Sequence, residues 1–413
     1  MTSPSNPSEL DPVGRAATWL TGILLLAFPA AAVLAKHSMT LIVTVLGVGL
    51  IAAAGVRAIR GGDRNGLGRT FGWVLAAAVA YLGWAGLVLL LRAPDCGRCG
   101  ESWIQLAGEV LVFLPLAGLG LAKRAGIRAE TILWALGIGV LLASLVLFVE
   151  MSFDAPIYRT LSGRWDDPRV DLSRFNRGSL ALVLVSIPVL GWLWSKGARA
   201  LVFAAAIPIL VVTVLGRSEA ALLTAIIALL VALLAAILPR VMAWVLMVGL
   251  TLGSLSAPWI AGPLQVWRVE TAQAFPLSIV HRFEIWDHAA YYAQLAPWTG
   301  WGFGGYRTLP IEGPHSDSYV VASHVEAHAH NVALQLWVET GIVGVALWLV
   351  MVGLVVRAAC ALGPALRPVA FAAIAAGLVP AMVSFGFWQA TYLAMLAMMA
   401  FVTLTARDVA TPR

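Results

Sequence analysis

Residues 200–238 read ALVFAAAIPILVVTVLG-R-SEAALLTAIIALLVALLAAIL, which is two apolar runs separated only by Arg217. A helix needs about 20 mostly apolar residues to cross the hydrocarbon core of a bilayer. Both runs approach that length, and neither carries a charge near its middle. This stretch therefore predicts two adjacent membrane-spanning helices joined by a very short connection at Arg217.

The same pattern recurs through the whole chain. Of its 413 residues, 60% are hydrophobic and only 12% are charged, whereas a soluble domain carries roughly 25% charged residues. Apolar runs of suitable length predict spans near 16–35, 39–56, 71–91, 103–122, 131–149, 179–195, 200–216, 218–238, 241–259, 331–356, 369–387 and 389–406. The composition excludes an ordinary soluble enzyme, a disordered chain and a nucleic-acid-binding protein. We expect an all-α integral membrane protein with about 12 transmembrane helices.

The distribution of Lys and Arg over short loops predicts the orientation. These residues gather on the side of the N-terminus, where they include Arg57, Arg60, Lys123 and Arg124. Because basic residues in short loops stay in the cytoplasm, both termini are expected inside. The first apolar run leads straight into further spans without a cleavage signal, so we interpret it as a retained helix.

This topology divides the chain into three parts. Residues 1–259 hold spans one to nine with an outer loop at 150–178, residues 260–330 form a large outer loop, and residues 331–413 hold the last three spans. Within the large loop, Phe283, Trp286 and Ala290 recur at helical spacing with polar residues between them, which predicts a helix lying on the outer membrane surface.

Two of the three cysteines, Cys96 and Cys99, fall in an outer loop. An oxidising compartment would permit a local disulfide between them that tightens the loop. A zinc site would need two further Cys or His ligands nearby, and none is evident in the sequence.

Six of the seven histidines lie in the large outer loop, at 281, 288, 315, 324, 328 and 330. His324 and His328 are spaced i, i+4, as in a helix-borne zinc pair, but the sequence fixes no third ligand. For His281, His288 and His315 we expect plain hydrogen bonds to neighbours. His330 differs, because it directly precedes a membrane helix that begins with Asn331, where an imidazole is suited to act as a general base.

Arginines form the second group of candidate residues. Arg217 lies between two apolar runs, where a charge is costly unless it meets an anion, headgroup phosphates or an acid such as Glu219. Arg282 opens the predicted surface helix, and Arg174 and Arg177 end the loop at 150–178. Guanidinium groups that converge at one membrane boundary suit a diphosphate, because each binds phosphate oxygens in a bidentate manner.

Two acids, Glu109 and Glu339, fall within predicted spans. Each could pair with an arginine or serve as a hydrogen-bonded structural carboxyl group, and the sequence does not choose between these roles.

Three segments together resemble the O-antigen ligase and O-antigen polymerase superfamily. They are RSEAA from Arg217, HRFEIWDHA followed by PWTGWGFGGY, and HAHNVALQLWVETGIVG at 328–344, of which the last is the most specific. The similarity covers mainly residues 200–356. It implies a membrane glycosyltransferase in which His330 is the essential histidine and Arg217 and Arg282 are the two arginines. Gly216 stands where many relatives have Ser.

The resemblance also implies the reaction and its place. Ligases of this family transfer a polysaccharide from undecaprenyl diphosphate to a sugar hydroxyl of lipid A–core, in lipopolysaccharide biosynthesis, on the periplasmic face of the bacterial inner membrane. They are regarded as inverting enzymes that need no metal ion or other cofactor. We expect His328, Asn331, Arg174 and Arg177 to support the site. The partners would be the lipid-linked donor, the lipid A–core acceptor and membrane lipids.

Two other functions stay open at this point. An O-antigen polymerase or a protein O-oligosaccharyltransferase of the same superfamily would use nearly the same donor with another acceptor. A polyprenyl-glycolipid transporter or flippase would use the arginines for passage instead of catalysis, but the polar residues gather at one face, and the predicted spans show few midplane charges or paired broken helices.

Overall fold

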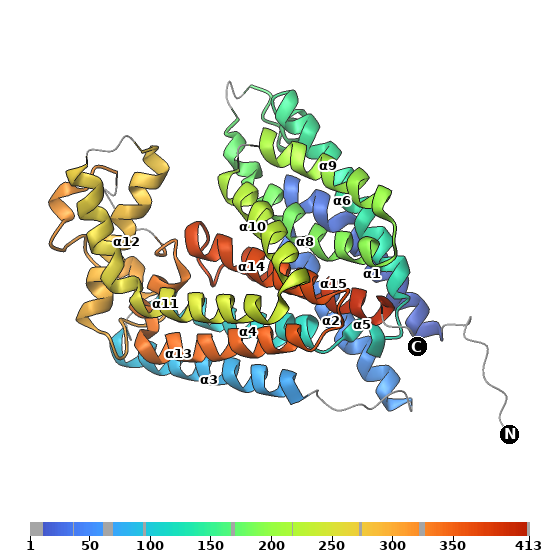
Figure 1. Ribbon diagram of the computed structural model, residues 1–413, viewed down its shortest axis with the longest axis horizontal. Coiled ribbons are helices and arrows are strands. Elements are labelled where there is room, and N and C mark those ends of the chain that lie inside the picture. The colour runs from blue at the N-terminus through green and yellow to red at the C-terminus, as the bar shows by residue number, and fades with distance from the viewer. Residues whose placement is uncertain are drawn as a thin grey trace.

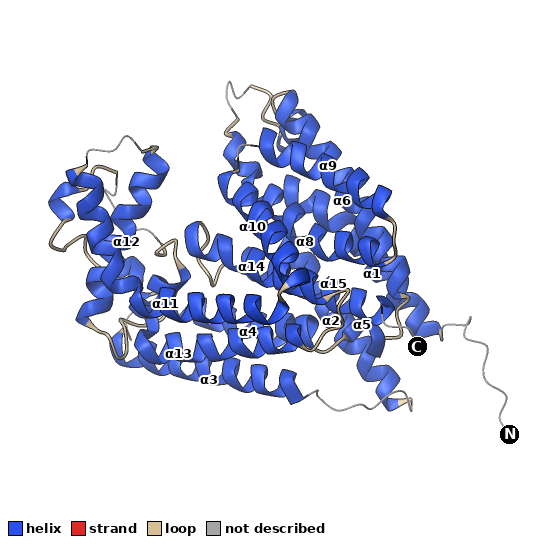
Figure 2. Ribbon diagram, in the orientation of Figure 1, coloured by secondary structure: helices blue, strands red, loops and turns tan. Residues whose placement is uncertain are grey.

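The computed structural model describes residues 11–35, 37–60, 69–93, 96–166, 170–216, 218–271, 275–321 and 327–410. Throughout these residues the regular structure is helical, without strands (Figure 2). The predicted all-α class is therefore confirmed for the part of the chain that is described.

The α-helices are α1 (Pro12–Leu34), α2 (Ser38–Ile59), α3 (Arg69–Arg92), α4 (Gly97–Gly118), α5 (Leu121–Arg124), α6 (Ala129–Ser152), α7 (Pro156–Ser162), α8 (Asn176–Ser195), α9 (Arg199–Leu215), α10 (Glu219–Ile237), α11 (Pro239–Glu270), α12 (Leu277–Leu295), α13 (Val332–Cys360), α14 (Arg367–Val383) and α15 (Ala390–Ala410). Short 3₁₀ turns occur at η1 (Leu172–Phe175), η2 (Gly305–Thr308) and η3 (Ser316–Ser318).

Every apolar run that was predicted to span the membrane forms a helix. Within the described residues, nine helices are both long and apolar enough to cross a bilayer, whereas the apolar helices α9 and α14 are shorter. Helix α4 falls outside both groups and carries Glu101, Gln105 and Glu109. The number of crossings and the orientation therefore stay predictions.

Several helix ends differ from the predicted spans, among them the ends of α11 and α14. Helix α11 continues past residue 259 to Glu270, because Gln265 and Arg268 near its end find hydrogen-bond partners in the following loop region. Helix α14 ends at Val383, before the predicted end at 387, and the apolar residues after it form a non-helical connection to α15. Hydropathy predicts which residues favour a lipid environment. It does not predict the residue at which hydrogen bonds to other segments end a helix.

The predicted helix of the large loop is present as α12, but its polar side does not face solvent. Glu284, Asp287 and His288 are all buried. Glu284 accepts hydrogen bonds from the backbone N–H groups of Val320 and Val321, and Asp287 accepts one from the Tyr319 hydroxyl. The expectation of a helix that simply lies along the membrane surface did not foresee this packing beneath the loop before α13.

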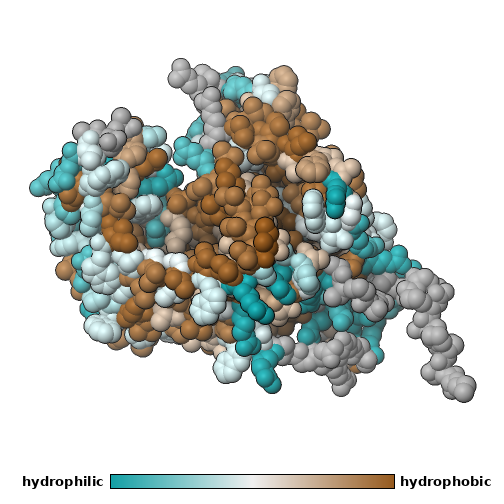
Figure 3. Space-filling model, viewed as in Figure 1, coloured by the Kyte–Doolittle hydropathy of each residue, from teal (hydrophilic) through white to brown (hydrophobic). Residues whose placement is uncertain are grey.

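The helices pack as a bundle around α8, with a second group to one side (Figure 1). Helix α8 contacts α1, α6, α9, α10, α14 and α15, so most of its surface is buried. Helices α11, α12 and α13 pack on one another, and α3 runs along α13. The space-filling view shows a deep notch between the part that carries α12 and the bundle that carries α10 (Figure 3).

Helix α13 is interrupted at Gly341, where φ is 63° and ψ is −164°. The loop between α12 and η2 crosses this break, since the N–H groups of Trp301 and Gly302 donate to the carbonyls of Val338 and Glu339. A Cβ added at Gly341 would lie 2.4 Å from the carbonyl carbon and oxygen of Trp298. The break therefore depends on glycine for both its backbone angles and its space.

Replacing Gly341 with alanine is expected to lower the stability of the fold by about 3–5 kcal/mol, from backbone strain and overpacking together. The measurement is the thermal unfolding midpoint in detergent. Gly249→Ala is the matched control, because a Cβ there would meet nothing within 4 Å. Equal unfolding midpoints for the two variants would show that the packing of the loop across the break in α13 contributes little to the stability of the fold.

Candidate functional site

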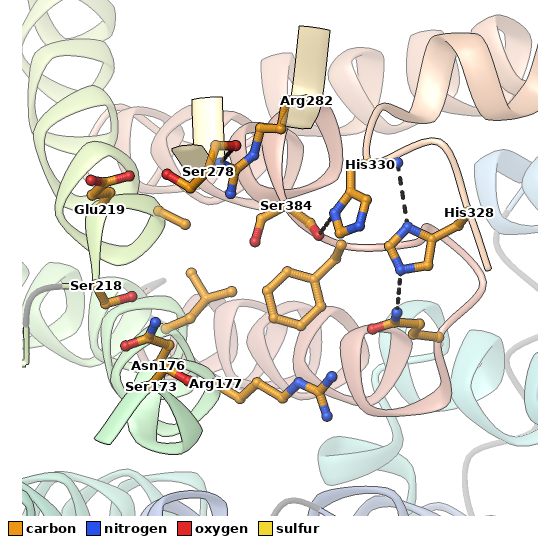
Figure 4. A pocket seen from close by; sticks show the side chains of 14 residues that line it. Ser173, Asn176, Arg177, Ser218, Glu219, Ser278, Arg282, His328, His330 and Ser384 are labelled. Carbon is orange, nitrogen blue, oxygen red and sulfur yellow. Dashed lines mark hydrogen bonds between the residues drawn. The ribbon is translucent and has the colours of Figure 1, made fainter. Parts of the chain in front are cut away.

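A cavity of about 390 Å³ lies between α8, α10 and α12 (Figure 4). Its lining residues come from the starts of helices and from the segments just before them; they are Ser173, Asn176, Arg177, Leu180, Ser218, Glu219, Ala220, Ser278, Arg282, His328, His330, Ser384, Phe385 and Gln389. In the close view, Arg282 and His330 lie along one wall, Arg177 lies across from them, and His328 lies beside His330.

Five helices begin at this cavity, which gives it an electrostatic character independent of side chains. Helices α8, α10 and α12 contribute residues of their first turns, and α13 and α15 begin just after His330 and Gln389. The first N–H groups of a helix have no partner within the helix, and its N-terminus carries a partial positive charge. Convergence of several such ends favours an anion.

His330 is held in an uncommon backbone conformation by the turn that precedes α13. Its φ is +50°, in the left-handed region that few residues other than glycine adopt. Its ring nitrogen Nδ1 lies 2.6 Å from the carbonyl oxygen of Ser384. Because a carbonyl can only accept, Nδ1 carries the proton, and the neutral ring has its lone pair on Nε2. This arrangement suits a base.

His328 lies against His330, with 4.1 Å between the ring centroids, but its surroundings disfavour a charge. The His330 N–H donates to His328 Nδ1, and the Gln389 side-chain nitrogen lies 2.8 Å from Nε2. Because Nδ1 accepts, a neutral ring carries its proton on Nε2, and an imidazolium would add a second N–H at Nδ1 that opposes the contact from the His330 N–H. Burial, followed by electrostatic interactions with His330, Arg307 and Arg177, lowers the pKa of His328 to about 3.

This lowered pKa makes the stability of the protein depend on pH. The unfolded chain, with a histidine pKa of about 6.5, binds more protons than the folded one between about pH 6.5 and pH 3. The contribution of neutral His328 is thus complete above that window and is lost as the pH falls through it. We expect the unfolding midpoint to fall less between about pH 7 and pH 5 in His328→Asn than in the wild type. An unchanged pH dependence would show that His328 is not held neutral.

Arg282 reaches the cavity from α12 with two of its nitrogens anchored. Nε donates to the carbonyl of Val383 at 2.6 Å, and Nη1 donates to the carbonyl of Ser278 at 2.7 Å. Arg177, on the first turn of α8, forms no hydrogen bond or ion pair with any other residue that the structure describes. The two guanidinium groups therefore present positive charge from opposite walls.

The other predicted site residues have different positions. The Asn331 side chain caps α13 by accepting from the Leu334 N–H at 3.1 Å. The Arg174 guanidinium lies over the ring of Tyr158, 3.1 Å from its centroid, and does not line the cavity. Arg217 and His324 lie outside the described residues, although Ser218 and Glu219, which follow Arg217, line the cavity.

The three histidines that were expected only to form hydrogen bonds with neighbours, His281, His288 and His315, do not line the cavity. His288 contacts the Tyr306 hydroxyl and the Pro310 carbonyl, and burial lowers its pKa. His315 Nδ1 lies 3.0 Å from an oxygen of Asp287. His281 belongs to α12 and is outside the lining. Among the described residues, no three His, Cys, Asp or Glu side chains are grouped as for a metal ion.

The connection between α14 and α15 contributes site residues that the sequence did not predict. Ser384 and Gln389 contact His330 and His328, and a Cβ at Gly386 would lie 2.7 Å from the His328 ring. These residues were placed in apolar spans, at 369–387 and 389–406, so their site role was not foreseen. The sequence FGFWQ at 385–389, with a glycine and a glutamine between two spans, was the available signal.

A disulfide joins Cys96 to Cys99 at the start of α4, as the sequence permitted. Gly304, from the glycine-rich loop, lies beside it, since a Cβ there would be 3.6 Å from Cys99 Sγ. The disulfide thus fixes the surface on which that loop packs.

The apolar helices and the cavity define the class: a multi-pass helical membrane protein with a basic cavity where several helices begin. Residues 204–349 match the family model described as O-antigen ligase, which confirms the resemblance seen in the sequence for this part of the chain. A protein of Rickettsia felis named "Putative polysaccharide ligase" is 26% identical over 218 residues. That alignment covers 52% of this chain and 52% of the relative, so it spans about half of each protein.

Proposed function

We propose that this protein is an O-antigen ligase, which transfers a polysaccharide from undecaprenyl diphosphate to a sugar hydroxyl of lipid A–core at the periplasmic face of a bacterial inner membrane. One observation carries the proposal: His330, Arg177 and Arg282, which are far apart in sequence, line one cavity. The match to the ligase family over residues 204–349 supports the same reading.

The cavity is suited to hold the leaving group. As the bond between the anomeric carbon and the diphosphate oxygen breaks, negative charge grows on that oxygen. Arg177 and Arg282 lie on opposite walls, and the starts of five helices add positive potential between them. These fixed groups offset the charge, and the proposal assigns no metal ion or other cofactor.

His330 is the proposed base. An acceptor hydroxyl attacks the anomeric carbon, its proton passes to Nε2 of His330, and the diphosphate leaves with the bonding electrons. Attack in line with the leaving group inverts the anomeric centre. The hydrogen bond from Nδ1 to Ser384 at 2.6 Å fixes the tautomer that this step requires. His328 is the weaker candidate, because burial lowers its pKa to about 3.

Glu219 places a carboxylate at one end of a cavity that is otherwise lined by basic groups. Its carboxylate lies near Ser278, at the end of the cavity away from His328 (Figure 4). A carboxylate would repel a diphosphate placed against it but accepts hydrogen bonds from sugar hydroxyls. In the proposal the diphosphate therefore lies between the arginines, and a sugar lies toward Glu219.

The disulfide supports the assignment to the periplasm. Disulfides persist in oxidising compartments, and the bond between Cys96 and Cys99 lies beside the glycine-rich loop that crosses α13. The opposite end of the bundle carries Arg57 near Gly126 and Arg407 near Gly120, as expected of a cytoplasmic surface.

The test is the product formed by purified protein in lipid vesicles with a glycan on undecaprenyl diphosphate. One reaction contains lipid A–core, one contains additional donor alone, and one contains an acceptor peptide, all with EDTA. The proposal expects the glycan on lipid A–core. Chain extension without acceptor would identify a polymerase, transfer to peptide would identify a protein glycosyltransferase, and transport of intact donor across the vesicle would identify a flippase.

A further inference from the structure

The connection between α14 and α15, residues 384–389, contacts both cavity histidines. The Ser384 carbonyl accepts from His330 Nδ1 at 2.6 Å, and Gln389 lies 2.8 Å from His328 Nε2. Gly386 packs closely against the His328 side chain, because a Cβ there would lie 2.7 Å from its Cδ2 atom. The position of both imidazoles therefore depends on where this connection lies.

The same connection is held from its other side by α13. The Phe387 N–H donates to Gln335 Oε1 at 3.0 Å, and the Trp388 indole N–H donates to Glu339 Oε2 at 3.0 Å. Gln335 and Glu339 are joined to each other, since Gln335 Nε2 donates to Glu339 Oε1 at 3.1 Å. Both side chains are almost completely buried, at 3% and 1% exposure.

Helix α13, which carries Gln335 and Glu339, is held in place by other segments next to Glu339. The break at Gly341 leaves carbonyl groups of α13 without helical partners, and they accept from other segments. Gly302 N–H donates to the Glu339 carbonyl, and Trp84 Nε1 donates to that of Thr340 at 2.8 Å. The backbone of Glu339 thus has a fixed position, and its side chain can hold residues 384–389 in place through Trp388.

A buried polar pair is costly unless its hydrogen bonds are made, which gives this arrangement little freedom. If Glu339 loses Trp388 or Gln335 loses Phe387, a buried group is left without its partner. The pair therefore favours one position of residues 384–389 over others. A carboxyl group that only filled space in α13 would not need to contact two consecutive residues of another segment.

We propose that Gln335 and Glu339 are positioning residues, which hold residues 384–389 so that His330 keeps its bond to Ser384 and presents Nε2 to the cavity. The inference rests on the proposed function, because it assigns the pair a role in glycan transfer. Neither side chain lines the cavity, so they act through the connection and do not touch the substrate. A displacement of a reacting group by about 1 Å can lower a rate by about 100-fold.

The chain offers a matched control on α4. Gln105 and Glu109 form the same i, i+4 pair, with Gln105 Nε2 donating to Glu109 Oε1 at 2.7 Å. Glu109 is also largely buried, at 9% exposure. Among the described residues, that pair has no hydrogen bond to the connection that contacts the histidines. Glu109→Gln therefore removes a buried carboxyl group without affecting residues 384–389.

The experiment compares Glu339→Gln, Trp388→Phe and Glu109→Gln in lipid nanodiscs. We expect Glu339→Gln and Trp388→Phe to lower kcat for glycan transfer by about 10- to 100-fold with little change in the Kd for undecaprenyl diphosphate. We also expect faster hydrogen–deuterium exchange at residues 384–389 and 327–331. Glu339→Gln leaves one acceptor oxygen for two donors, Trp388 and Gln335, so it loses one of the two bonds. Because both variants act on the same group of hydrogen bonds, the double variant should lose less than the product of the two single effects. Glu109→Gln should match the wild type in all three measurements.

Normal kcat in both variants would overturn the proposal, as would unchanged exchange at residues 384–389. A loss of donor affinity equal to the loss of rate would also overturn it, because it would indicate a general disturbance of the cavity. Wild-type protein that binds undecaprenyl diphosphate but transfers no glycan would instead contradict the proposed function. Exchange needs no turnover, so it still reports in that case whether the pair holds the connection.

Discussion

Replacement of His330 by asparagine is expected to reduce glycan transfer by about 10²- to 10⁴-fold, the range by which general bases commonly accelerate reactions. Asparagine tolerates the left-handed backbone at this position, where φ is +50°. Its side-chain nitrogen is as many bonds from the backbone as Nδ1 and can donate to the Ser384 carbonyl in its place. The variant therefore removes Nε2 while keeping the turn.

The measurement is kcat and the Kd for undecaprenyl diphosphate, with His315→Asn as the control. His315 contacts Asp287 and does not line the cavity, so its replacement should leave both values near those of the wild type. His330→Asn should lose kcat but retain donor affinity. Activity within a few-fold of the wild type would remove His330 from the proposed mechanism.

The same activity measurement on His328→Asn distinguishes the roles of His328 and His330. His328 has contacts at both ring nitrogens, and its pKa of about 3 makes it a poor acceptor of a proton near neutral pH. If His328 supports the turn only, His328→Asn should lose less activity than His330→Asn. The reverse order would exchange the two roles.

How far the sequence predicted this structure differs between its helices and its site. Every apolar run became a helix, because burying the backbone in an apolar environment requires that its hydrogen bonds be made locally. The convergence of Arg177, Arg282 and His330 in one cavity had no such local cause. It depends on how α8, α12 and α13 pack, and no periodicity in the chain encodes that packing.

The connection between α14 and α15 shows why hydropathy fails where polar groups are buried. Phe385 and Phe387 were predicted to end one span and Trp388 to separate it from the next, yet the Phe387 N–H donates to Gln335 instead of continuing a helix. The acids of α12 show the opposite case. Glu284 and Asp287 read as solvent-facing, but backbone N–H groups and a tyrosine hydroxyl satisfy them inside the protein. In both cases a long-range hydrogen bond overrides the local pattern.

Loss of the cavity arginines is expected to have the second large effect, on donor binding. Hydrogen bonds to a charged group are worth about 1.5–3 kcal/mol, so Arg177→Gln should weaken undecaprenyl diphosphate binding by about 10- to 100-fold. Arg177 is the cleaner site because it has no hydrogen bond to other described residues, whereas Arg282→Gln would also release the carbonyls of Val383 and Ser278. Arg282→Lys keeps the positive charge but removes the planar guanidinium group, so it tests separately whether bidentate hydrogen bonding to phosphate is needed.

The control for these variants is Arg240→Gln at the start of α11, which is outside the cavity lining and should leave affinity unchanged. Binding of undecaprenyl phosphate measures whether one or both phosphates are held. If Arg177 and Arg282 contact different phosphates, the monophosphate should lose affinity relative to the diphosphate in the wild type, and this difference should shrink in each variant. If both variants bind the diphosphate as tightly as Arg240→Gln does, the positive charge on the two walls has another purpose, and the leaving group does not lie between them.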